Sequence, residues 1–384
     1  MTIFWGVLLG LVAVFWSVQS LLLAHGVRRL PRIRDAAPLP DADCPRVSII
    51  FSARDEAEKL PAALATMLAL DYPDYEVIAV NDRSTDATPE ILEEVARRDA
   101  RLRVLHVREL PPGWLGKPHG LQRGFEESTG DWLVFTDADV HFAPELLRRA
   151  LSVALGRGWD HLTLLGGVTL RGFWETAVLT YFAAMFTMNF QPWRVSNPKS
   201  RRFMGVGSFQ LVRRAAYELS GTHRRLAMEV IDDMKLGKIL KQAGCCSGVG
   251  MAIGQVALRW HDGVGNIIRG TTKNFFAGAN YRLSVAILQL LALFAISVLP
   301  FCALIFADSR PRAAAAIAAL LAATIQGGTA RDMKASPLYG LTHPLSALIF
   351  AYMLLRSTVV TLRQGGIVWR GTFYALEELR KGIV

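Results

Sequence analysis

Cysteine is scarce in this sequence, which has only four among its 384 residues. Their spacing fits no metal-binding pattern, and the one adjacent pair is not a usual disulfide framework. The four residues are Cys44, Cys245, Cys246 and Cys302. We therefore expect reduced thiols, in keeping with a catalytic part that faces the cytosol.

Two common nucleotide-binding signatures are also missing. The segment Ser52–Glu56, which follows the first expected strand, lacks the Gly-x-Gly-x-x-Gly turn of dinucleotide-binding folds. The chain has no Walker A sequence either. These absences argue against an enzyme that uses nicotinamide or flavin and against a P-loop nucleotide site.

Acidic residues are outnumbered, with 33 Asp and Glu against 43 Lys and Arg, which gives a formal net charge of +10. Many of the basic residues lie beside apolar segments. This arrangement fits the positive-inside rule and an anionic membrane surface better than nucleic acid. Because hydrophobic residues make up 52% of the chain, the composition predicts a membrane partner and no nucleic-acid partner.

The N-terminal residues 3–23 form an apolar stretch of about the length that crosses a bilayer. Four arginines follow within residues 28–34, which predicts that the next part of the chain is cytosolic. A cleaved signal peptide is the alternative, but it would carry positive charge before the apolar run and a small-residue cleavage site after it. We interpret residues 1–27 as a retained transmembrane anchor and residues 28–45 as a linker.

The C-terminal residues 283–384 are interpreted as a second membrane region with a tail. The candidate spans are Ser284–Phe306, Ala313–Ala330 and His343–Leu362. If all three cross, the basic tail ends outside, against the charge rule, so we expect one of them to be re-entrant or interfacial. The sequence thus predicts an integral inner (cytoplasmic) membrane protein whose catalytic domain faces the cytosol.

Between these parts, in residues 46–282, short apolar runs alternate with helical patterns. The expected strands are Val47–Phe51, Tyr75–Val80, Leu102–Val107 and Trp132–Thr136, and the expected helices are Glu56–Leu70, Pro89–Arg98 and Lys117–Ser128. Such alternation predicts an α/β fold with a doubly wound, parallel sheet. No internal repeat is visible.

Acidic residues follow two of these strands. The run Trp132–Thr136 ends in Asp137 and Asp139, which are one residue apart. Open α/β sheets bind their ligands at the carboxyl ends of the strands. Two carboxylates there can hold a hard divalent cation, which in turn can hold a diphosphate. Asp82 follows the second strand, where it could hydrogen-bond a base or a ribose hydroxyl or, alternatively, cap the next turn.

Four segments, in order, are typical of one enzyme family. They read VSIIFSARDEAEKL, VIAVNDRSTDAT, GWLGKPHGLQRG and GDWLVFTDADV. In order and spacing they resemble family 2 glycosyltransferases, and the resemblance extends over about residues 45–280. It implies an inverting enzyme with the nucleotide-diphosphate-sugar transferase fold, which is GT-A-like.

The resemblance also implies roles for donor-binding residues. It places a nucleobase pocket after the first strand, a base or ribose contact after the second and the sugar, the diphosphate and a Mg²⁺ or Mn²⁺ ion at the acid pair. The residues that match these positions are Ala53, Arg54 and Glu56 for the nucleobase, Asp82 for uracil or ribose, Lys117 near the nucleotide, and Asp137 and Asp139 for sugar, diphosphate and metal.

A second acid pair, Asp232-Asp233, lies within Met228–Leu236. Inverting transfer needs a general base to accept the proton of the acceptor hydroxyl. The family has an acid-Asp pair at this place and its Asp acts as the base, so the resemblance makes Asp233 the base and Asp232 its neighbour. The usual Glu-Asp is Asp-Asp here. The alternative is an N-cap of the helix that continues through Leu240.

Two further segments concern the acceptor. We interpret Gly172–Trp193 as an interfacial helix, with Trp174, Tyr181 and Trp193 at headgroup level. A buried core helix is the alternative. Gly205–Gln210 resembles the floor of the family's acceptor site, although a plain tight turn would explain its glycines as well. The acceptor residues expected from the resemblance are Gly207, Ser208 and Phe209, with His261 added.

The Gln-x-x-Arg-Trp motif of processive polysaccharide synthases is present only in two imperfect versions. Gln255 to Trp260 is one residue too long, and Asn266 to Gly270 has the spacing with two residues replaced. The second version resembles membrane-bound glycosyltransferases of the ceramide, carotenoid and hopanoid-associated kind. We expect Arg269 to neutralise the diphosphate, with His261 and Lys273 as lesser candidates.

These observations predict a membrane-anchored, metal-dependent, inverting glycosyltransferase. The expected donor is a nucleotide-diphosphate sugar, a UDP-hexose in the first place, and the expected acceptor is a membrane lipid at the cytosolic face. A processive polysaccharide synthase is one alternative. A catalytically silent binding protein that keeps the fold is another.

Overall fold

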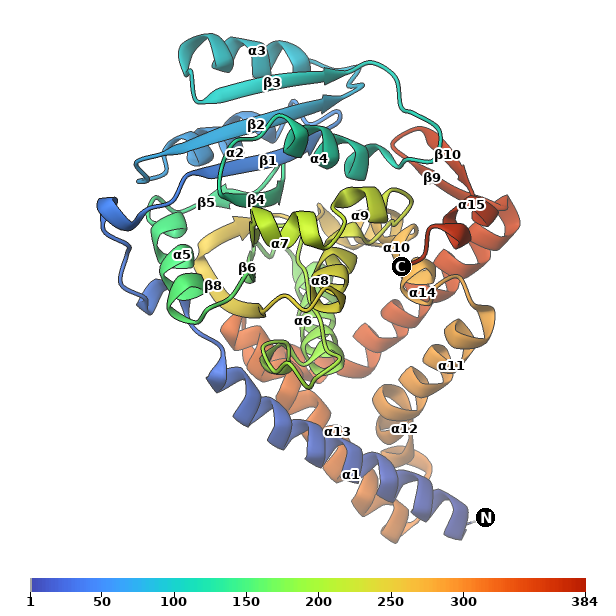
Figure 1. Ribbon diagram of the computed structural model, residues 1–384. Helices are drawn as coiled ribbons and strands as arrows, with labels where there is room; N and C mark the ends of the chain where they lie inside the picture. Colours follow the sequence, from blue (N-terminus) through green and yellow to red (C-terminus); the bar gives the residue numbers. More distant parts are fainter. Residues whose placement is uncertain (1) are drawn as a thin grey trace. The chain divides into compact units, whose positions relative to one another are not determined.

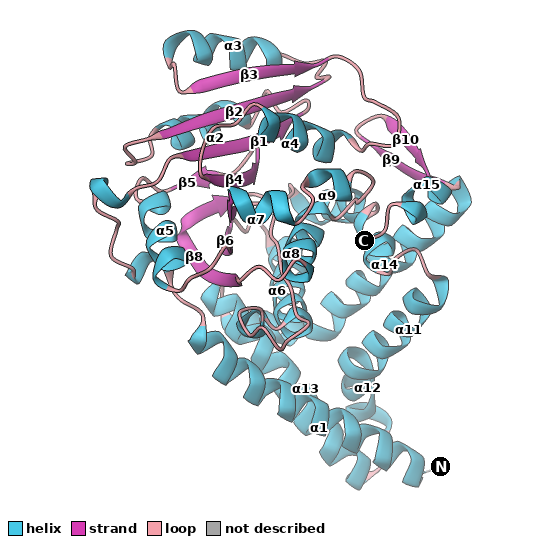
Figure 2. Cartoon of the chain, viewed as in Figure 1, coloured by secondary structure: helices cyan, strands magenta, loops and turns pink. Residues whose placement is uncertain are grey.

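The computed structural model describes residues 2–384, which separate into two compact units. One unit, here called the helical unit, comprises Met1–Arg28, Leu170–Gln191 and Trp260–Leu376. The other, the sheet unit, comprises Arg29–Thr169, Pro192–Arg259 and Glu377–Val384. Each unit is described by itself. Figure 1 labels the elements of both, and Figure 2 shows that the long strands belong to the sheet unit.

An eight-stranded sheet in the order β3-β2-β1-β4-β7-β6-β8-β5 forms the centre of the sheet unit. The strands are β1 (Val47–Ala53), β2 (Tyr75–Asp82), β3 (Leu102–Val107), β4 (Trp132–Asp137), β5 (His141–Phe142), β6 (His161–Val168), β7 (Gln210–Arg213) and β8 (Ser247–Leu258). The four strands expected from the sequence form β1 to β4, and they are parallel to their neighbours. For these strands the prediction is confirmed.

The sheet as a whole is mixed, so the prediction of a parallel sheet is wrong for β7 and β5, whereas β6 and β8 are parallel to each other. Strand β7 is antiparallel to both β4 and β6, and β5 is antiparallel to β8. Both reversed strands are short, four and two residues, and give too little periodicity to be read from sequence. The reversal matters because the residues that precede β7, and not those that follow it, lie at the carboxyl end of β4.

Helices cover both faces of this sheet, as expected for a doubly wound fold. Apolar side chains of α2 (Leu60–Leu68), α3 (Thr88–Arg98) and α5 (Leu146–Gly156) share one buried cluster with alternate residues of β1, β2 and β4. Apolar side chains of the helices α4 (Gly116–Glu126), α7 (Arg214–Leu219) and α8 (Asp232–Gln242) share a second buried cluster. The strand residues of this cluster include apolar residues of β1, β2 and β4 that point to the other face of the sheet. Successive strands are added on one side of β1 up to β3, and β4 lies on its other side. Folds of this kind bind ligands at such a switch point in strand order, here between β1 and β4.

Helix α2 begins at Leu60 and not at Glu56, because the loop before it is tied to the loop after β2. The Glu56 N–H donates to Thr88 Oγ1 at 2.9 Å, and the Ala57 N–H donates to Asp86 Oδ2 at 3.0 Å. Asp55 adopts a left-handed φ of 53°, and its carboxylate accepts the Thr85 N–H at 2.7 Å. These side-chain bonds compete with the first helical turn, so residues 54–59 remain a fixed loop.

Among the residues that the structure describes, four helices, which lie in the helical unit, are long and apolar enough to cross a bilayer. These stretches are Ile3–Arg29, Leu283–Phe306, Pro311–Asp332 and Pro337–Gln364. They contain the four spans expected from the sequence. The helices of this unit are α1 (Thr2–Gly26), α6 (Phe173–Phe190), α9 (Gly263–Thr271), α10 (Asn274–Gly278), α11 (Leu283–Leu293), α12 (Leu299–Phe306), α13 (Ser309–Asp332) and α14 (His343–Gln364), with a π-helical turn at Phe294–Val298.

Helix α6 is buried over much of its length inside the helical unit. Tyr181 is fully buried and hydrogen-bonds Ser297 Oγ at 3.2 Å, so the expectation that Tyr181 lies at a membrane surface is wrong. The single acid, Glu175, is buried too, and its carboxylate accepts the N–H groups of Arg171 and Gly263, both at 2.8 Å. Phe173 and Trp174 at the start of the helix and Asn189 near its end are exposed. The burial of residues 175–181 favours the alternative of a buried helix.

A β-hairpin follows α14. Strands β9 (Gly366–Trp369) and β10 (Thr372–Ala375) pair antiparallel around Arg370-Gly371, whose φ angles are 49° and 77°. Two positive φ angles are what a two-residue hairpin turn requires. The chain then forms the short helix α15 (Leu376–Lys381), and its last residues, 377–384, belong to the sheet unit.

Glu76, at the start of β2, gives a prediction about stability. It is buried, and its Oε1 accepts bonds from Ser48 Oγ at 2.7 Å and from the N–H and Oγ1 of Thr129 at 2.7 and 2.8 Å. Burial alone would raise the pKa of Glu76, but these hydrogen bonds outweigh it and lower the pKa below its ordinary value. A depressed carboxyl pKa contributes stability above the ordinary pKa, and this contribution is lost as pH falls through the folded-state pKa.

We therefore expect Glu76→Gln to lower the free energy of unfolding by about 1–3 kcal/mol at pH 7. The difference from the unmodified chain should shrink as the pH falls below about 4, the ordinary carboxyl pKa, and should vanish only below the lower pKa of the folded state, where the carboxylate is protonated in both states. Denaturant unfolding of the full chain in detergent at pH 7 and at low pH measures both. Asp74→Asn, which removes an exposed acid paired with Arg46, is the matched control and should change stability little. Equal losses in the two variants would contradict the assignment.

Candidate functional site

The acid pair after β4 lies where the sequence predicts it, at the carboxyl end of a buried strand. Trp132 to Thr136 are buried, whereas Asp137 and Asp139 are partly exposed. The register pairs Ser52 of β1 with Asp137 of β4. The two carboxylates therefore emerge at the point between β1 and β4 where the strand order reverses.

Each acid of this pair contacts a lysine. Lys117 Nζ lies 2.6 Å from Asp137 Oδ1, and Lys59 Nζ lies 3.2 Å from Asp139 Oδ2. Lys117 also lies 3.8 Å from Asp232 Oδ2. Burial would lower the pKa of Lys117, but the charges of Asp137, Asp232 and Asp233 outweigh it and raise the pKa above its ordinary value. Lys117 is therefore a fixed positive charge among the acids.

The second acid pair opens helix α8, and its two members differ in exposure. Asp232 is buried, with 4% of its side chain exposed, whereas Asp233 is partly exposed. Asp233 Oδ2 accepts the Gly207 N–H at 3.0 Å, and its Oδ1 accepts the Met234 N–H at 2.7 Å. Ile231, which has no side-chain cap bond, is the N-cap residue. Neither acid is thus the helix cap, and only Asp233 offers an accessible carboxylate.

Gly207 lies between the two acid pairs. A Cβ placed on Gly207 would be 2.7 Å from Asp137 Oδ2 and 3.2 Å from Asp233 Oδ2. Carboxylates far apart in the sequence thus meet at one residue of the Gly205–Gln210 loop. This loop can approach them because β7 runs antiparallel to β4, which brings the segment before β7 to the acids.

Ser208 and Phe209, which follow Gly207, are not exposed as residues that line an acceptor site would be. Phe209 is fully buried and its ring packs on Phe142 with centroids 5.6 Å apart. Ser208 is also buried; its Oγ has no hydrogen-bond partner among residues 2–384, and its carbonyl accepts from Thr136 Oγ1 at 2.8 Å. Of the three residues, only Gly207 is partly exposed beside the acids.

Buried polar side chains of neighbouring strands fix the Gly205–Gln210 loop, and they were not predicted from the sequence. Thr163 Oγ1 accepts the Val206 N–H at 2.9 Å. His161 lies between Gln210 Oε1 at 3.2 Å and Ser247 Oγ at 3.3 Å. Burial lowers the pKa of His161 to about 4, so its ring is neutral at pH 7. The available signal was a polar residue in the middle of an apolar strand pattern, as in β6 and β7.

Two glycines let the loop press against helix α8. A Cβ on Gly205 would overlap the carbonyl oxygen of Asp233, and a Cβ on Gly237 would overlap the carbonyl oxygen of Met204. Only glycine permits an approach this close. Gly237 lies in the middle of a helix, where glycine is otherwise unfavourable, and this was the sequence signal for it.

The segment before Asp232 is held by the last residues of the described chain. Glu229 and Lys235 form a buried ion pair at 3.1 Å. The Val384 N–H donates to Glu229 Oε1 at 2.6 Å, and Lys235 Nζ donates to the Val384 carbonyl at 2.9 Å. Buried charges need such partners, so Asp232 and Asp233 begin their helix from a fixed position.

The residues expected near the nucleobase surround the ends of β1 and β2. Asp82 is almost fully buried, and both of its oxygens accept from Arg83, at 2.7 and 3.1 Å. Ala53 is fully buried, and Glu56 is fixed through its backbone. Arg54 is mostly buried, and its Nε has no hydrogen-bond partner in the part of the chain that the structure describes. Arg83 was not expected from the sequence.

Arg269, His261 and Lys273 belong to the helical unit. Arg269 donates to Asn266 Oδ1 at 2.6 Å, one turn earlier in α9. His261 packs so closely on Gly270 that a Cβ there would overlap its ring. Lys273 Nζ lies 4.0 Å from the ring centroid of Trp369 in the hairpin. The structure thus brings together the expected residues of the sheet unit, and it places these three in a separate basic segment.

Residues 48–218 match the sequence family described as Glycosyl transferase family 2. This part of the chain, somewhat less than half of its 384 residues, is a member of that family. The matched range contains Asp82, Lys117, Asp137, Asp139 and Gly207, and it ends before Asp232 and Asp233. The family resemblance expected from the four sequence segments is confirmed.

Two relatives illustrate the range of similarity. A beta-monoglucosyldiacylglycerol synthase from Synechocystis is 28% identical over 144 residues, which are 35% of this chain and 30% of that protein. A 4,4'-diaponeurosporenoate glycosyltransferase from Staphylococcus aureus is 24% identical over 341 residues, which are 86% of this chain and 89% of that protein. The matched part thus spans about a third of the length of the first relative.

A solved structure supports the fold. A mannosyltransferase from Pyrobaculum calidifontis, in complex with GDP-Man and Mn²⁺, has a TM-score of 0.51 with 17% sequence identity, over 92% of this chain and 98% of that one. At this identity the likeness concerns the fold alone. The expected GT-A-like α/β fold with long apolar helices near both ends is confirmed.

The acids of this site suit a metal only with help from a ligand. No group of three or more His, Cys, Asp or Glu among the described residues could hold an ion by itself. Mg²⁺ is commonly bound by one or two carboxylates together with substrate phosphates. Asp137 and Asp139 are hard oxygen donors of that kind, so they fit a Mg²⁺ or Mn²⁺ ion whose other ligands come from a diphosphate.

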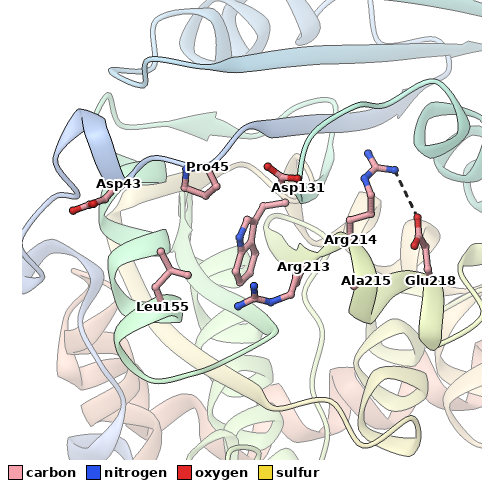
Figure 3. A pocket seen from close by; sticks show the side chains of 9 residues that line it. Asp43, Pro45, Asp131, Leu155, Arg213, Arg214, Ala215 and Glu218 are labelled. Carbon is pink, nitrogen blue, oxygen red and sulfur yellow. Dashed lines mark ion pairs between the residues drawn. The ribbon is translucent and has the colours of Figure 1, made fainter.

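A cavity of about 500 Å³ lies at the amino end of β4, at the other end of this strand from Asp137 and Asp139 (Figure 3). Asp131, Trp132, Arg213 and Glu218 are among the residues that line it. Arg213 stacks over the Trp132 ring at 4.8 Å, and Arg214 lies 4.0 Å from Glu218. Because the acids of the site lie at the other end of β4, this cavity is separate from the site.

Proposed function

We propose that this protein transfers a hexose from a nucleotide-diphosphate sugar, in the first place a UDP-sugar, to a membrane lipid with inversion at the anomeric carbon. The observation that carries the proposal is the meeting of Asp137 and Asp233 at Gly207. It provides a donor-side carboxylate and an accessible base within one small site. An inverting transfer needs this pairing of functions.

In the proposed reaction, the acceptor oxygen attacks the anomeric carbon as the bond from that carbon to the diphosphate oxygen breaks. The acceptor proton passes to Asp233, and the electron pair of the broken bond leaves with the diphosphate. Lys117, fixed between Asp137 and Asp232, supplies positive charge close to the departing group. A divalent cation held by Asp139 and Asp137 would screen the same charge.

The lipid acceptor and the cytosolic face are supported by three observations. Within the described part of the chain, four helices are long and apolar enough to cross a bilayer. Arginines follow the first of them, which favours a cytosolic sheet unit. The names of both relatives reported above refer to lipid-soluble acceptors, a diacylglycerol and a carotenoid acid. The incomplete Gln-x-x-Arg-Trp motif speaks against a processive polysaccharide synthase.

The proposal is tested by incubating membranes that contain the protein with labelled UDP-glucose, UDP-galactose, UDP-GlcNAc and GDP-mannose. We expect one UDP-sugar to deliver label to material soluble in organic solvent, and we expect EDTA to abolish the transfer and Mg²⁺ or Mn²⁺ to restore it. Label in insoluble polymer would favour the synthase instead. No transfer from any donor would overturn the proposed function. Membranes that carry Asp233→Asn provide the matched control.

A further inference from the structure

Lys59 is a residue of the site that the family resemblance did not include. It is the last residue of the loop before α2 and contacts Asp139 Oδ2 at 3.2 Å. Its side chain is 37% exposed, and that of Asp139 is 20% exposed. The backbone position of Lys59 is fixed, since its N–H donates to the Glu56 carbonyl at 3.1 Å within the tied loop.

The contact occupies Oδ2 of Asp139, one of the two oxygens through which this carboxylate could bind a metal. A divalent cation that binds this oxygen would lie close to the Lys59 ammonium group, and the two positive charges would repel each other. Asp137 is occupied by Lys117 in the same way. The two lysines differ in exposure, however, at 37% for Lys59 and 23% for Lys117. Lys59 has a flexible four-carbon stem and can leave Asp139 through solvent.

We propose that Lys59 is a displaceable counter-ion that occupies Asp139 until the diphosphate of the donor arrives, so that divalent-cation binding depends on the donor. The diphosphate brings negative charge for both the ion and the released Lys59. Without the diphosphate, a cation that binds Asp139 must break the Lys59–Asp139 ion pair, and no new negative charge replaces Asp139 as the partner of Lys59. This inference rests on the proposed function, since it takes the donor to be a nucleoside diphosphate sugar.

The test measures Mn²⁺ binding directly, by the loss of the electron paramagnetic resonance signal of free Mn²⁺. The full chain in detergent is titrated without nucleotide and with saturating UDP. Without UDP, we expect Lys59→Gln to bind Mn²⁺ about three- to tenfold more tightly than the unmodified chain, which is the effect of losing a partly exposed ion pair. With UDP the difference should become small or reverse.

Arg46→Gln is the matched control. It removes one positive charge from an exposed ion pair with Asp74, at the amino end of β1 and away from Asp139, and it should leave Mn²⁺ binding unchanged. Asp139→Asn should weaken Mn²⁺ binding in every background. If Lys59→Gln binds Mn²⁺ no more tightly than the unmodified chain in the absence of UDP, the inference is overturned. If Lys59→Gln binds Mn²⁺ more tightly but UDP has no effect on either protein, Lys59 is a counter-ion of Asp139 and the proposal that the donor is a UDP-sugar is wrong.

Discussion

Asp233→Asn is expected to lower kcat by about 10²–10⁴-fold, the usual contribution of a positioned general base. Asparagine keeps the size of the side chain and an oxygen that can accept the Gly207 N–H, so the loop should stay in place. It cannot accept a proton from the acceptor. Donor affinity, measured by equilibrium binding of the labelled nucleotide sugar, should change only a few-fold, because the loss concerns the transition state.

The matched comparison is Asp232→Asn. Asp232 is buried beside Lys117, so its replacement should disturb the charge balance around Lys117 and weaken donor binding more than it lowers kcat. Initial rates over a range of donor concentrations separate the two effects. If Asp232→Asn costs more in kcat than Asp233→Asn, or if Asp233→Asn keeps most of the activity, the assignment of the base is wrong.

Gly237→Ala is expected to produce the second-largest loss of activity, although it removes no functional group. The added methyl would overlap the Met204 carbonyl, so the loop that carries Gly207 must move away from α8. A displacement of about 1 Å between reacting groups can lower turnover by about 10²-fold. Crowding of the packed contact should also lower stability by about 1–3 kcal/mol. Turnover under saturating substrates and thermal unfolding in detergent measure the two losses.

Gly156→Ala is the control for this change. Gly156 ends helix α5, and a Cβ there would meet nothing within 4 Å. Both variants replace a helical glycine of the sheet unit by alanine, but only Gly237→Ala presses on the loop. Normal activity in Gly237→Ala would mean that the spacing between the loop and α8 does not control the reaction. A loss that follows unfolding alone, without a change in kcat of the folded fraction, would mean the same.

The fold and the acid residues could be predicted from local patterns. Strands β1, β2 and β4 carry runs of buried apolar residues, and Asp137 and Asp139 lie at the end of such a run, so periodicity and chain order were sufficient for them. The reversed strand β7 was beyond this reasoning, because a four-residue strand has almost no pattern of its own. Helix α2 was predicted to begin at Glu56 because periodicity cannot register the side-chain bonds from Thr88 and Asp86 that hold residues 56 and 57 outside it.

The pairing of acids with lysines could not be predicted in the same way. Lys59 and Asp139 lie 80 residues apart in the sequence, and nothing in the composition of either segment indicates that their side chains meet. The role of Gly237 depends on the position of the Met204 carbonyl, which is a property of the packed structure. Tyr181 was placed at the membrane surface because aromatic residues are common there, whereas the folded chain buries it against Ser297.

The antiparallel direction of β7 has a consequence for how this site can diverge. The residues proposed to hold the donor lie at the carboxyl ends of β1, β2 and β4, and Asp82 and Asp137 are the last residues of β2 and β4. Gly207, by contrast, lies in a segment that enters a strand, and residues 192–204 before it contain no strand and only one short helical turn. Insertions and deletions there would alter what reaches the acids without shifting the register of β4. Under the proposed function, such changes would alter which acceptor is used while the donor chemistry stays the same.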